Sequence, residues 1–220
     1  MKRILLLLSV VLFPVILQAG ENETKILIVT NMGKITVKLY NETPLHRDNF
    51  IKLVQENKYD SIMFHRVIKL FMIQAGEKYA PDDSINAGFV DKDLEYTVPA
   101  EIVYPAYFHK RGQLCAARQG DDVNPGRASS ANQFYIVTGK HYTEHDLDKM
   151  EQEKNITLTP EQREAYQTAG GTPHLDGAYT VFGEVVKGIK VVNKIELVNT
   201  DNGDHPLKSV RIKTMKILNR

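Results

Sequence analysis

The sequence has almost no cysteine and no excess of charge of either sign. Its single cysteine, Cys115, excludes an internal disulfide and zinc-finger spacing, and its apolar neighbours Leu114 and Ala116 indicate a small core residue. The 28 Lys and Arg residues nearly balance the 27 Asp and Glu residues, which argues against a nucleic-acid-binding surface or a polyacidic partner. At 220 residues, with 42% hydrophobic and 25% charged residues, the chain is expected to form one folded domain.

One long apolar run stands apart from this composition, at the N-terminus. Lys2 and Arg3 precede an uncharged apolar stretch from Ile4 to Leu17, and the small residues Ala19-Gly20 follow shortly after. The run is shorter than the roughly 20 residues that a bilayer-spanning helix needs, and its flanks are typical of a secretory signal peptide. We therefore expect residues 1–19 to be a cleaved leader and the protein to be exported, periplasmic or secreted, with no membrane contact after cleavage; a retained membrane anchor is the alternative.

The rest of the chain has a strand-rich pattern. β-Branched and polar residues alternate over 25–30 and 34–40 around a turn, which predicts a hairpin. Thr43-Pro44 is typical of a helix N-cap with a proline in the first turn, and Phe50, Leu53 and Val54 continue at helical spacing. Many short strands with two core helices favour a mainly β fold, a closed antiparallel barrel, over a doubly wound sheet. Further elements are expected as a helix at 188–197 and strands at 62–68, 71–74, 112–117, 133–137, 179–185 and 210–217.

Residues 139–171 have a different composition, rich in Glu, Lys, Gln and Thr. Thr143 followed by Asp146 and Thr159 followed by Gln162 are helix-start signals, so we expect two short helices. The few large apolar residues are too little for a separate core. This segment is therefore interpreted as an insertion that lies against the barrel as a lid or a decoration.

One arginine lies within an apolar and aromatic run. Arg66 follows Phe64 and precedes Phe71 and Met72, and the run also contains Gln74 but no nucleophile. An arginine keeps its proton at neutral pH, so it is a poor general base and a good five-donor hydrogen-bonding group. We expect Arg66 to act electrostatically in an apolar pocket.

Three blocks of residues, in order along the chain, carry a resemblance to a known family. They are Phe64-His65-Arg66 with Phe71-Met72-x-Gln74; Gly112-x-Leu114 with Ala117 and Asn132-Gln133-Phe134-Tyr135-Ile136; and Leu175-Asp176-Gly177-x-Tyr179-x-Val181-Phe182-Gly183. On these blocks the sequence resembles the cyclophilins, the barrel family of peptidyl-prolyl cis/trans isomerases. The resemblance covers roughly residues 25–218, within an expected domain at 24–218, and implies eight strands capped by two helices, catalysed rotation about X-Pro bonds, and no cofactor or metal.

The resemblance also implies roles for individual side chains. Arg66 would donate a hydrogen bond to the amide nitrogen of the twisted X-Pro bond, and Gln74 would orient Arg66 and the substrate carbonyl. The wall of the proline pocket would be formed by Phe71, Met72, Tyr135 and Leu175, and its rim by Tyr179. Gln133 and the backbone around Ala117 would bind the peptide that precedes the proline. Arg118 departs from the family pattern, which commonly has Asn there, and is expected to retune a loop.

The implied partners are proline-containing peptides and unfolded exported proteins, whose folding a monomer of this chain would assist. The alternative that keeps the pocket is a proline-peptide-binding chaperone module with little turnover.

A rival motif, His141-x-x-Glu144-His145, fits the H-x-x-E-H pattern of inverted zinc proteases. Thr143 as a helix N-cap would leave His141 outside that helix, which argues against a shared metal.

Overall fold

The computed structural model describes residues 23–77, 94 and 96–219. The expected leader at 1–19 lies outside these residues, so its role stays a prediction. Among the helices that the model describes, none is both long and apolar enough to cross a membrane.

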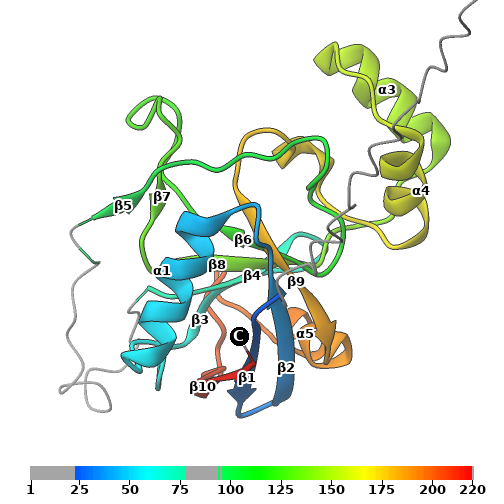
Figure 1. Cartoon of the computed structure of the whole chain (residues 1–220). Coiled ribbons are helices and arrows are strands. Elements are labelled where there is room, and N and C mark those ends of the chain that lie inside the picture. The colour runs from blue at the N-terminus through cyan, green and yellow to red at the C-terminus, as the bar shows by residue number, and fades with distance from the viewer. Residues whose placement is uncertain (1–22, 78–93, 95, 220) are drawn as a thin grey trace, which may run out of the picture.

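Eight antiparallel strands form one curled sheet in the order β10-β1-β2-β9-β6-β8-β4-β3 (Figure 1). The two strands at the ends of this order approach each other, since Met63 and Arg211 form a bridge and the Phe64 N–H donates to the Val210 carbonyl at 2.9 Å. The mainly β prediction is confirmed, while full closure of the barrel stays a prediction. The strands are β1 (Lys25–Thr30), β2 (Gly33–Leu39), β3 (Phe64–Ile68), β4 (Met72–Ala75), β6 (Gln113–Ala116), β8 (Phe134–Val137), β9 (Val181–Lys187) and β10 (Ile212–Asn219). A second sheet, not foreseen, pairs β5 (Thr97–Val98) with β7 (Ser129–Ser130).

The expected hairpin joins β1 to β2 through a turn that requires glycine. Gly33 has a φ of +142°, and a Cβ atom there would lie 2.7 Å from Cγ2 of Val191. The Thr30 hydroxyl donates to the Gly33 carbonyl at 2.8 Å and closes the turn. Because successive strand residues face opposite sides, Ile26, Ile28 and their partners across the hairpin are fully buried in the main core.

Helix α1 (Pro44–Gln55) begins at the expected residue but is capped by a different one. The Thr43 side chain makes no capping hydrogen bond. The carboxylate of Glu101 instead accepts from the backbone N–H groups of Leu45, at 3.0 Å, and His46, at 2.9 Å. A negative charge at a helix N-terminus is favourable, so the cap is supplied from a distant part of the chain. The prediction of Pro44 in the first turn is confirmed and that of a Thr43 side-chain cap is wrong.

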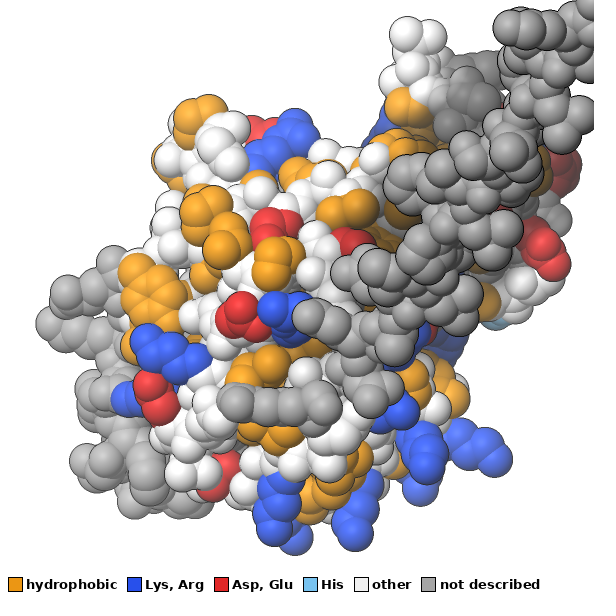
Figure 2. Space-filling view, in the orientation of Figure 1, with side chains coloured by type: hydrophobic (Ala, Val, Ile, Leu, Met, Phe, Trp, Pro, Cys, Tyr) orange, Lys and Arg blue, Asp and Glu red, His pale blue; other side chains and the backbone are white. Residues whose placement is uncertain are grey.

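Two helices pack on the sheet, as predicted. Helix α1 contacts β10, while α5 (Ile189–Glu196) contacts β2, β3 and β4. Between them lies one apolar core in which Phe50 makes edge-on ring contacts with Phe134 and Phe182. On the face shown in Figure 2, side chains of both charge signs are spread over the surface, with lysine and arginine more frequent at the end where β1, β2 and α5 lie.

The segment 139–171 contains the two expected helices, α3 (Glu144–Lys154) and α4 (Pro160–Thr168), and each begins with a capping box. They project beside the sheet (Figure 1), and a short helix, η1 (Pro173–Leu175), follows them along the chain. The segment was expected to have too few large apolar residues for a separate core, and the apolar cluster that it forms is shared with the rest of the chain. Leu147, Leu158 and Tyr166 are buried together with Phe108, so a residue from outside the segment completes a small cluster.

Candidate functional site

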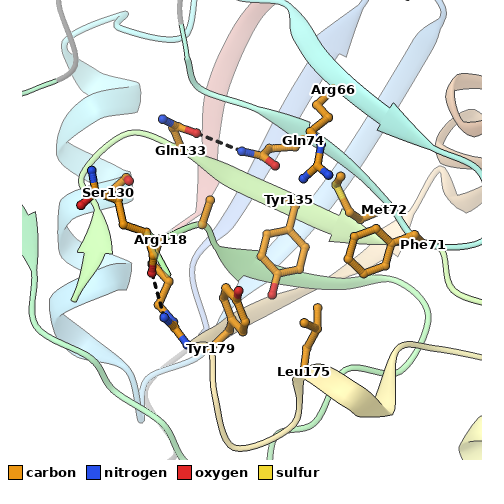
Figure 3. Close-up of a pocket in the computed structure, with 12 residues that line it drawn as sticks. Arg66, Phe71, Met72, Gln74, Arg118, Ser130, Gln133, Tyr135, Leu175 and Tyr179 are labelled. Carbon is orange, nitrogen blue, oxygen red and sulfur yellow. Dashed lines mark hydrogen bonds between the residues drawn. The ribbon is translucent and has the colours of Figure 1, made fainter. Parts of the chain in front are cut away.

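A cavity of about 290 Å³ lies on the face of the sheet away from the main core. All nine predicted site residues line it, so the structure brings together side chains from three separate blocks of sequence (Figure 3). Their individual roles stay predictions. The lining consists of Arg66, Phe71, Met72, Gln74, Ala117, Gln133, Tyr135, Leu175 and Tyr179, together with Arg118, Gln119 and Ser130.

The strand register explains why these side chains meet. Arg66 on β3 lies opposite Gln74 on β4, and Gln74 lies opposite Tyr135 on β8. Directly opposed residues of antiparallel strands point to the same face of a sheet, so the three side chains form one row across it. Leu175, at the end of η1, and Tyr179, from the connection between η1 and β9, close the row from the other side (Figure 3).

The guanidinium of Arg66 reaches into the cavity beside Met72 (Figure 3). Its side chain is 44% exposed, and its Nε atom lies 3.4 Å from Oδ2 of Asp204. Gln74 donates from Nε2 to Oε1 of Gln133 at 2.9 Å. The side chain of Gln74 is thus hydrogen-bonded to Gln133 and the guanidinium of Arg66 is paired with Asp204, while the predicted role of Gln74 in orienting Arg66 stays a prediction.

The other half of the cavity is apolar and aromatic. Met72 is 2% exposed and Tyr135 is 4% exposed, so both form a buried base. The Phe71 ring stacks on His174, with ring centroids 5.4 Å apart, and Tyr179 stands edge-on to Tyr135 at 6.1 Å. This half of the cavity therefore offers apolar and aromatic contacts to a bound group of low polarity.

The backbone at Ala117 is already used within the protein. Its N–H donates to the Gln133 carbonyl at 3.0 Å, and its carbonyl accepts from the Ser130 N–H at 2.9 Å. A carbonyl oxygen has two lone pairs, so the Ala117 oxygen keeps one for a bound peptide N–H. At Ala117, the predicted main-chain contact with a bound peptide can therefore be made only by the carbonyl oxygen, as a hydrogen-bond acceptor.

Arg118 is a lining residue whose position the sequence did not reveal. Its guanidinium carbon lies 4.3 Å above the Tyr179 ring, and its side chain is 4% exposed. It donates to the carbonyls of Ala178, at 2.9 Å, and Gln119, at 2.8 Å, and it pairs with Asp121 at 2.6 Å. The only signal in the sequence was its departure from the family pattern, which gave no indication that the residue forms a wall.

The structure also bears on the two other reactive groups considered. Helix α3 begins after Thr143, so His141 lies outside it, and Nδ1 of His141 is 3.1 Å from the Gln167 carbonyl. Within residues 23–77, 94 and 96–219, no group of three or more His, Cys, Asp or Glu side chains is arranged to hold a metal ion. Burial raises the pKa of the Cys115 thiol well above its ordinary value, so this residue is a protonated core side chain rather than a nucleophile.

Comparison with known proteins agrees with this geometry. Residues 25–217 match the family model described as cyclophilin type peptidyl-prolyl cis-trans isomerase/CLD. A putative peptidyl-prolyl cis-trans isomerase of Staphylococcus aureus is 31% identical over 204 residues, which are 91% of this chain and 94% of that protein. The chain therefore belongs to the cyclophilin-type peptidyl-prolyl cis-trans isomerase family.

Other relatives are larger or more distant. The chain is 33% identical to a putative bifunctional phosphatase/peptidyl-prolyl cis-trans isomerase of Streptococcus pyogenes and 31% identical to peptidyl-prolyl cis-trans isomerase-like 2 of Rhizopus delemar. These matches cover 90% and 86% of this chain but only 40% and 28% of those two proteins. The fold resembles that of a cyclophilin-type isomerase of Cryptosporidium parvum, with a TM-score of 0.63 and 22% identity over 90% of this chain and 99% of that one. A second structure of that protein was determined in the presence of the dipeptide Ala-Pro.

Proposed function

We propose that this protein is a peptidyl-prolyl cis/trans isomerase that accelerates rotation about X-Pro bonds in extended peptide segments. The observation that carries the proposal is the position of Arg66, whose guanidinium faces an aromatic cavity on the outside of the sheet (Figure 3). Family membership and the lining residues support the same reading. No cofactor is needed, because the reaction makes and breaks no covalent bond.

The reaction requires a temporary loss of amide resonance. Rotation about a peptide bond has a barrier of roughly 18–20 kcal/mol, because the nitrogen lone pair is delocalised into the carbonyl. In the twisted transition state the lone pair returns to the proline nitrogen. A hydrogen-bond donor at that nitrogen therefore binds the transition state more tightly than either planar form, and this difference accelerates the reaction.

Arg66 is suited to supply that donor. Its guanidinium remains protonated and is half exposed toward the cavity, with one ion pair to Asp204. Such a charge-assisted hydrogen bond, at about 3–4 kcal/mol, accounts for a factor of about 10²–10³ in rate. The rest comes from holding the flanking residues in place and from moving the amide into a less polar setting.

The remaining lining residues divide between the two ends of the peptide. Phe71, Met72, Tyr135 and Leu175 form the wall that receives the proline ring, with Tyr179 at its rim. Gln133 and the free lone pair of the Ala117 carbonyl bind the backbone that precedes the proline, and Gln74 holds Gln133 in place for this contact. The peptide must be extended for its backbone to reach both ends.

We also propose that the protein works outside the cytoplasm on exported proteins, as a monomer that has lost its leader. The apolar run at residues 4–17 supports export.

The approach of β3 to β10 at the Met63–Arg211 bridge supports a closed barrel. The different composition of residues 139–171 supports their being an insertion into the family fold.

The test is the exchange rate of a short Ala-Pro-containing peptide, measured by magnetisation-transfer NMR with and without the protein. Wild-type protein should accelerate exchange, and Arg66→Ala should lose about 10²–10³ of the acceleration while peptide binding persists. Equal exchange rates with and without wild-type protein, in the presence of measurable binding, would make the protein a proline-peptide-binding module instead.

A further inference from the structure

Four buried side chains form a hydrogen-bonded series from α4 to the base of the pocket. Oη of Tyr166 lies 2.5 Å from Oδ2 of Asp176, Nδ1 of His109 lies 3.0 Å from Oδ1 of Asp176, and Nε2 of His109 lies 3.0 Å from Oη of Tyr135. The exposed fractions of Tyr166, His109 and Tyr135 are 0%, 1% and 4%, and that of the Asp176 side chain is 3%. Of these residues, Tyr135 alone lines the cavity. We call these residues the Tyr166–Tyr135 series.

The direction of each hydrogen bond in the series follows from the chemistry of its members. An ionised carboxylate can only accept, so Asp176 accepts from the Tyr166 hydroxyl, from Nδ1–H of His109 and, at 2.8 Å, from the His109 backbone N–H. Neutral histidine carries one ring proton. When His109 is neutral and this proton is on Nδ1, the Nε2 atom accepts and the Tyr135 hydroxyl donates to it. Burial raises the pKa of both tyrosines well above the ordinary value, so both keep their protons.

The series also fixes the orientation of two aromatic rings. The His109 ring is stacked on Tyr135, with centroids 6.2 Å apart and planes 14° apart. Tyr179 stands edge-on to both rings, at 6.3 Å from His109 and 6.1 Å from Tyr135. Because His109 is bonded at both ring nitrogens, it cannot rotate without breaking a hydrogen bond. Two of the three aromatic side chains that line the pocket, Tyr135 and Tyr179, therefore contact a histidine that does not itself line the cavity.

The segment 139–171, together with Thr172 directly after it, also packs against this histidine and its neighbour Phe108. Tyr166 packs edge-on against Phe108, the residue before His109, with centroids 5.6 Å apart. The Thr172 N–H donates to the His109 carbonyl at 2.8 Å, and a Cβ atom on Gly171 would lie 2.3 Å from that same oxygen. None of the twelve lining residues comes from this segment. Its contact with the pocket is therefore from behind, which does not fit a lid and leaves the other expected role, a decoration that lies against the barrel.

We propose that Asp176 and His109 are positioning residues for the Tyr135 ring, and that Tyr166 makes the segment 139–171 a mechanical support of the proline pocket. The proposal rests on the isomerase function proposed above. Loss of the Tyr166 hydroxyl removes one of the three donors to Asp176, which loosens His109 and then the ring on which the proline ring would rest. The segment is thus part of the site, although it touches no substrate.

The test compares two tyrosines of the same cluster. Tyr166→Phe removes only the hydroxyl that donates to Asp176, and kcat/KM for an Ala-Pro-containing peptide should fall about threefold to tenfold, as expected for one misplaced contact. Tyr142→Phe is the matched control, since the Tyr142 ring packs edge-on against Tyr166 at 6.1 Å but lies outside the series. Its kcat/KM should equal that of wild type. The thermal unfolding midpoints of both variants show whether a fall in kcat/KM comes from unfolding of the protein or from displacement of the Tyr135 ring in a folded protein.

A double-mutant cycle tests whether the series acts as a unit. Once Tyr135→Phe has removed the last hydroxyl, adding Tyr166→Phe should cause no further loss of kcat/KM. Independent, multiplicative losses would overturn the proposal, and so would a Tyr166→Phe variant as active as the Tyr142→Phe control.

A spectroscopic measurement tests the series without reference to activity. In alkaline buffer, the ¹⁵N shifts of His109 should show the proton on Nδ1 and an unprotonated Nε2. A proton on Nε2 would contradict the hydrogen-bond directions and overturn the proposal, even if Tyr166→Phe failed to fold. If wild-type protein instead proved inactive while His109 carried its proton on Nδ1, the isomerase function would fail and the series would stand.

Discussion

Two arginines face the same pocket from opposite ends, and the protein holds them in opposite ways (Figure 3). The Arg66 side chain is 44% exposed and makes one ion pair, at 3.4 Å, with the partly exposed Asp204. The Arg118 side chain is 4% exposed, and its Nε and Nη1 donors are used by two backbone carbonyls and Asp121. Both carry five N–H donors. The number of donors left free, rather than the charge, therefore separates the group that can act on a substrate from the group that builds the wall.

The largest effect on stability should come from Arg118. Arg118→Met keeps the length of the side chain but leaves the carbonyls of Ala178 and Gln119 without a donor and removes the contact with the Tyr179 ring. We expect the free energy of unfolding to fall by about 2–4 kcal/mol, because the Arg118 side chain is buried and its partner Ala178 is half-buried, whereas Gln119 is exposed and should contribute little. Urea denaturation measures this change. A variant as stable as wild type would show that the Arg118 contacts contribute little and would remove the contrast with Arg66.

A smaller effect is expected at the polar side of the cavity. Gln74→Met removes the donor to Gln133 but keeps a side chain of similar length. Gln133 then loses its fixed orientation toward the peptide backbone, and we expect KM to rise about threefold to tenfold with kcat changed less, as for the loss of one neutral hydrogen bond. Steady-state kinetics over a range of peptide concentrations separates the two constants. A fall in kcat alone would instead assign Gln74 to the reacting bond.

The smallest effect should come from Asp204, the partner of Arg66. Asp204→Asn keeps the shape of the side chain and removes its charge. Because both members of the pair are about two-fifths exposed, the ion pair should contribute less than about 1 kcal/mol to stability. We expect kcat to change by no more than about threefold. The kcat of the variant should also depend less on salt concentration than that of wild type. A loss as large as that of Arg66→Ala would mean that Asp204, rather than the free donors of Arg66, limits the reaction.

Sequence patterns predicted the parts of the molecule that depend on local or motif information. The two capping boxes of α3 and α4 lie within four residues each and were found from their spacing. Arg66, Gln74 and Tyr135 were found from the resemblance, and the strand register then explains why they form one row. The roles of these residues remain predictions that kinetic measurements must test.

The features that were missed all depend on long-range contacts. Glu101 caps α1 from outside the helix, where no helix-start pattern could reveal it. Asp204 reaches Arg66 because the loop before β10 folds over β3, and its main-chain carbonyl accepts from the Val67 N–H at 2.9 Å. The small core of α3 and α4 needs Phe108, which precedes the segment by about thirty residues. In each case the partner is set by the tertiary fold and not by spacing.

The turnover of two Arg66 variants at saturating peptide tests the central claim most directly. Arg66→Lys keeps a positive charge but loses the planar fork of donors, and Arg66→Ala loses both. If free guanidinium donors stabilise the twisted bond, kcat should fall at least about tenfold in Arg66→Lys and about 10²–10³ in Arg66→Ala, with the peptide Kd and the thermal unfolding midpoint near wild type. Wild-type kcat in both variants would contradict the account.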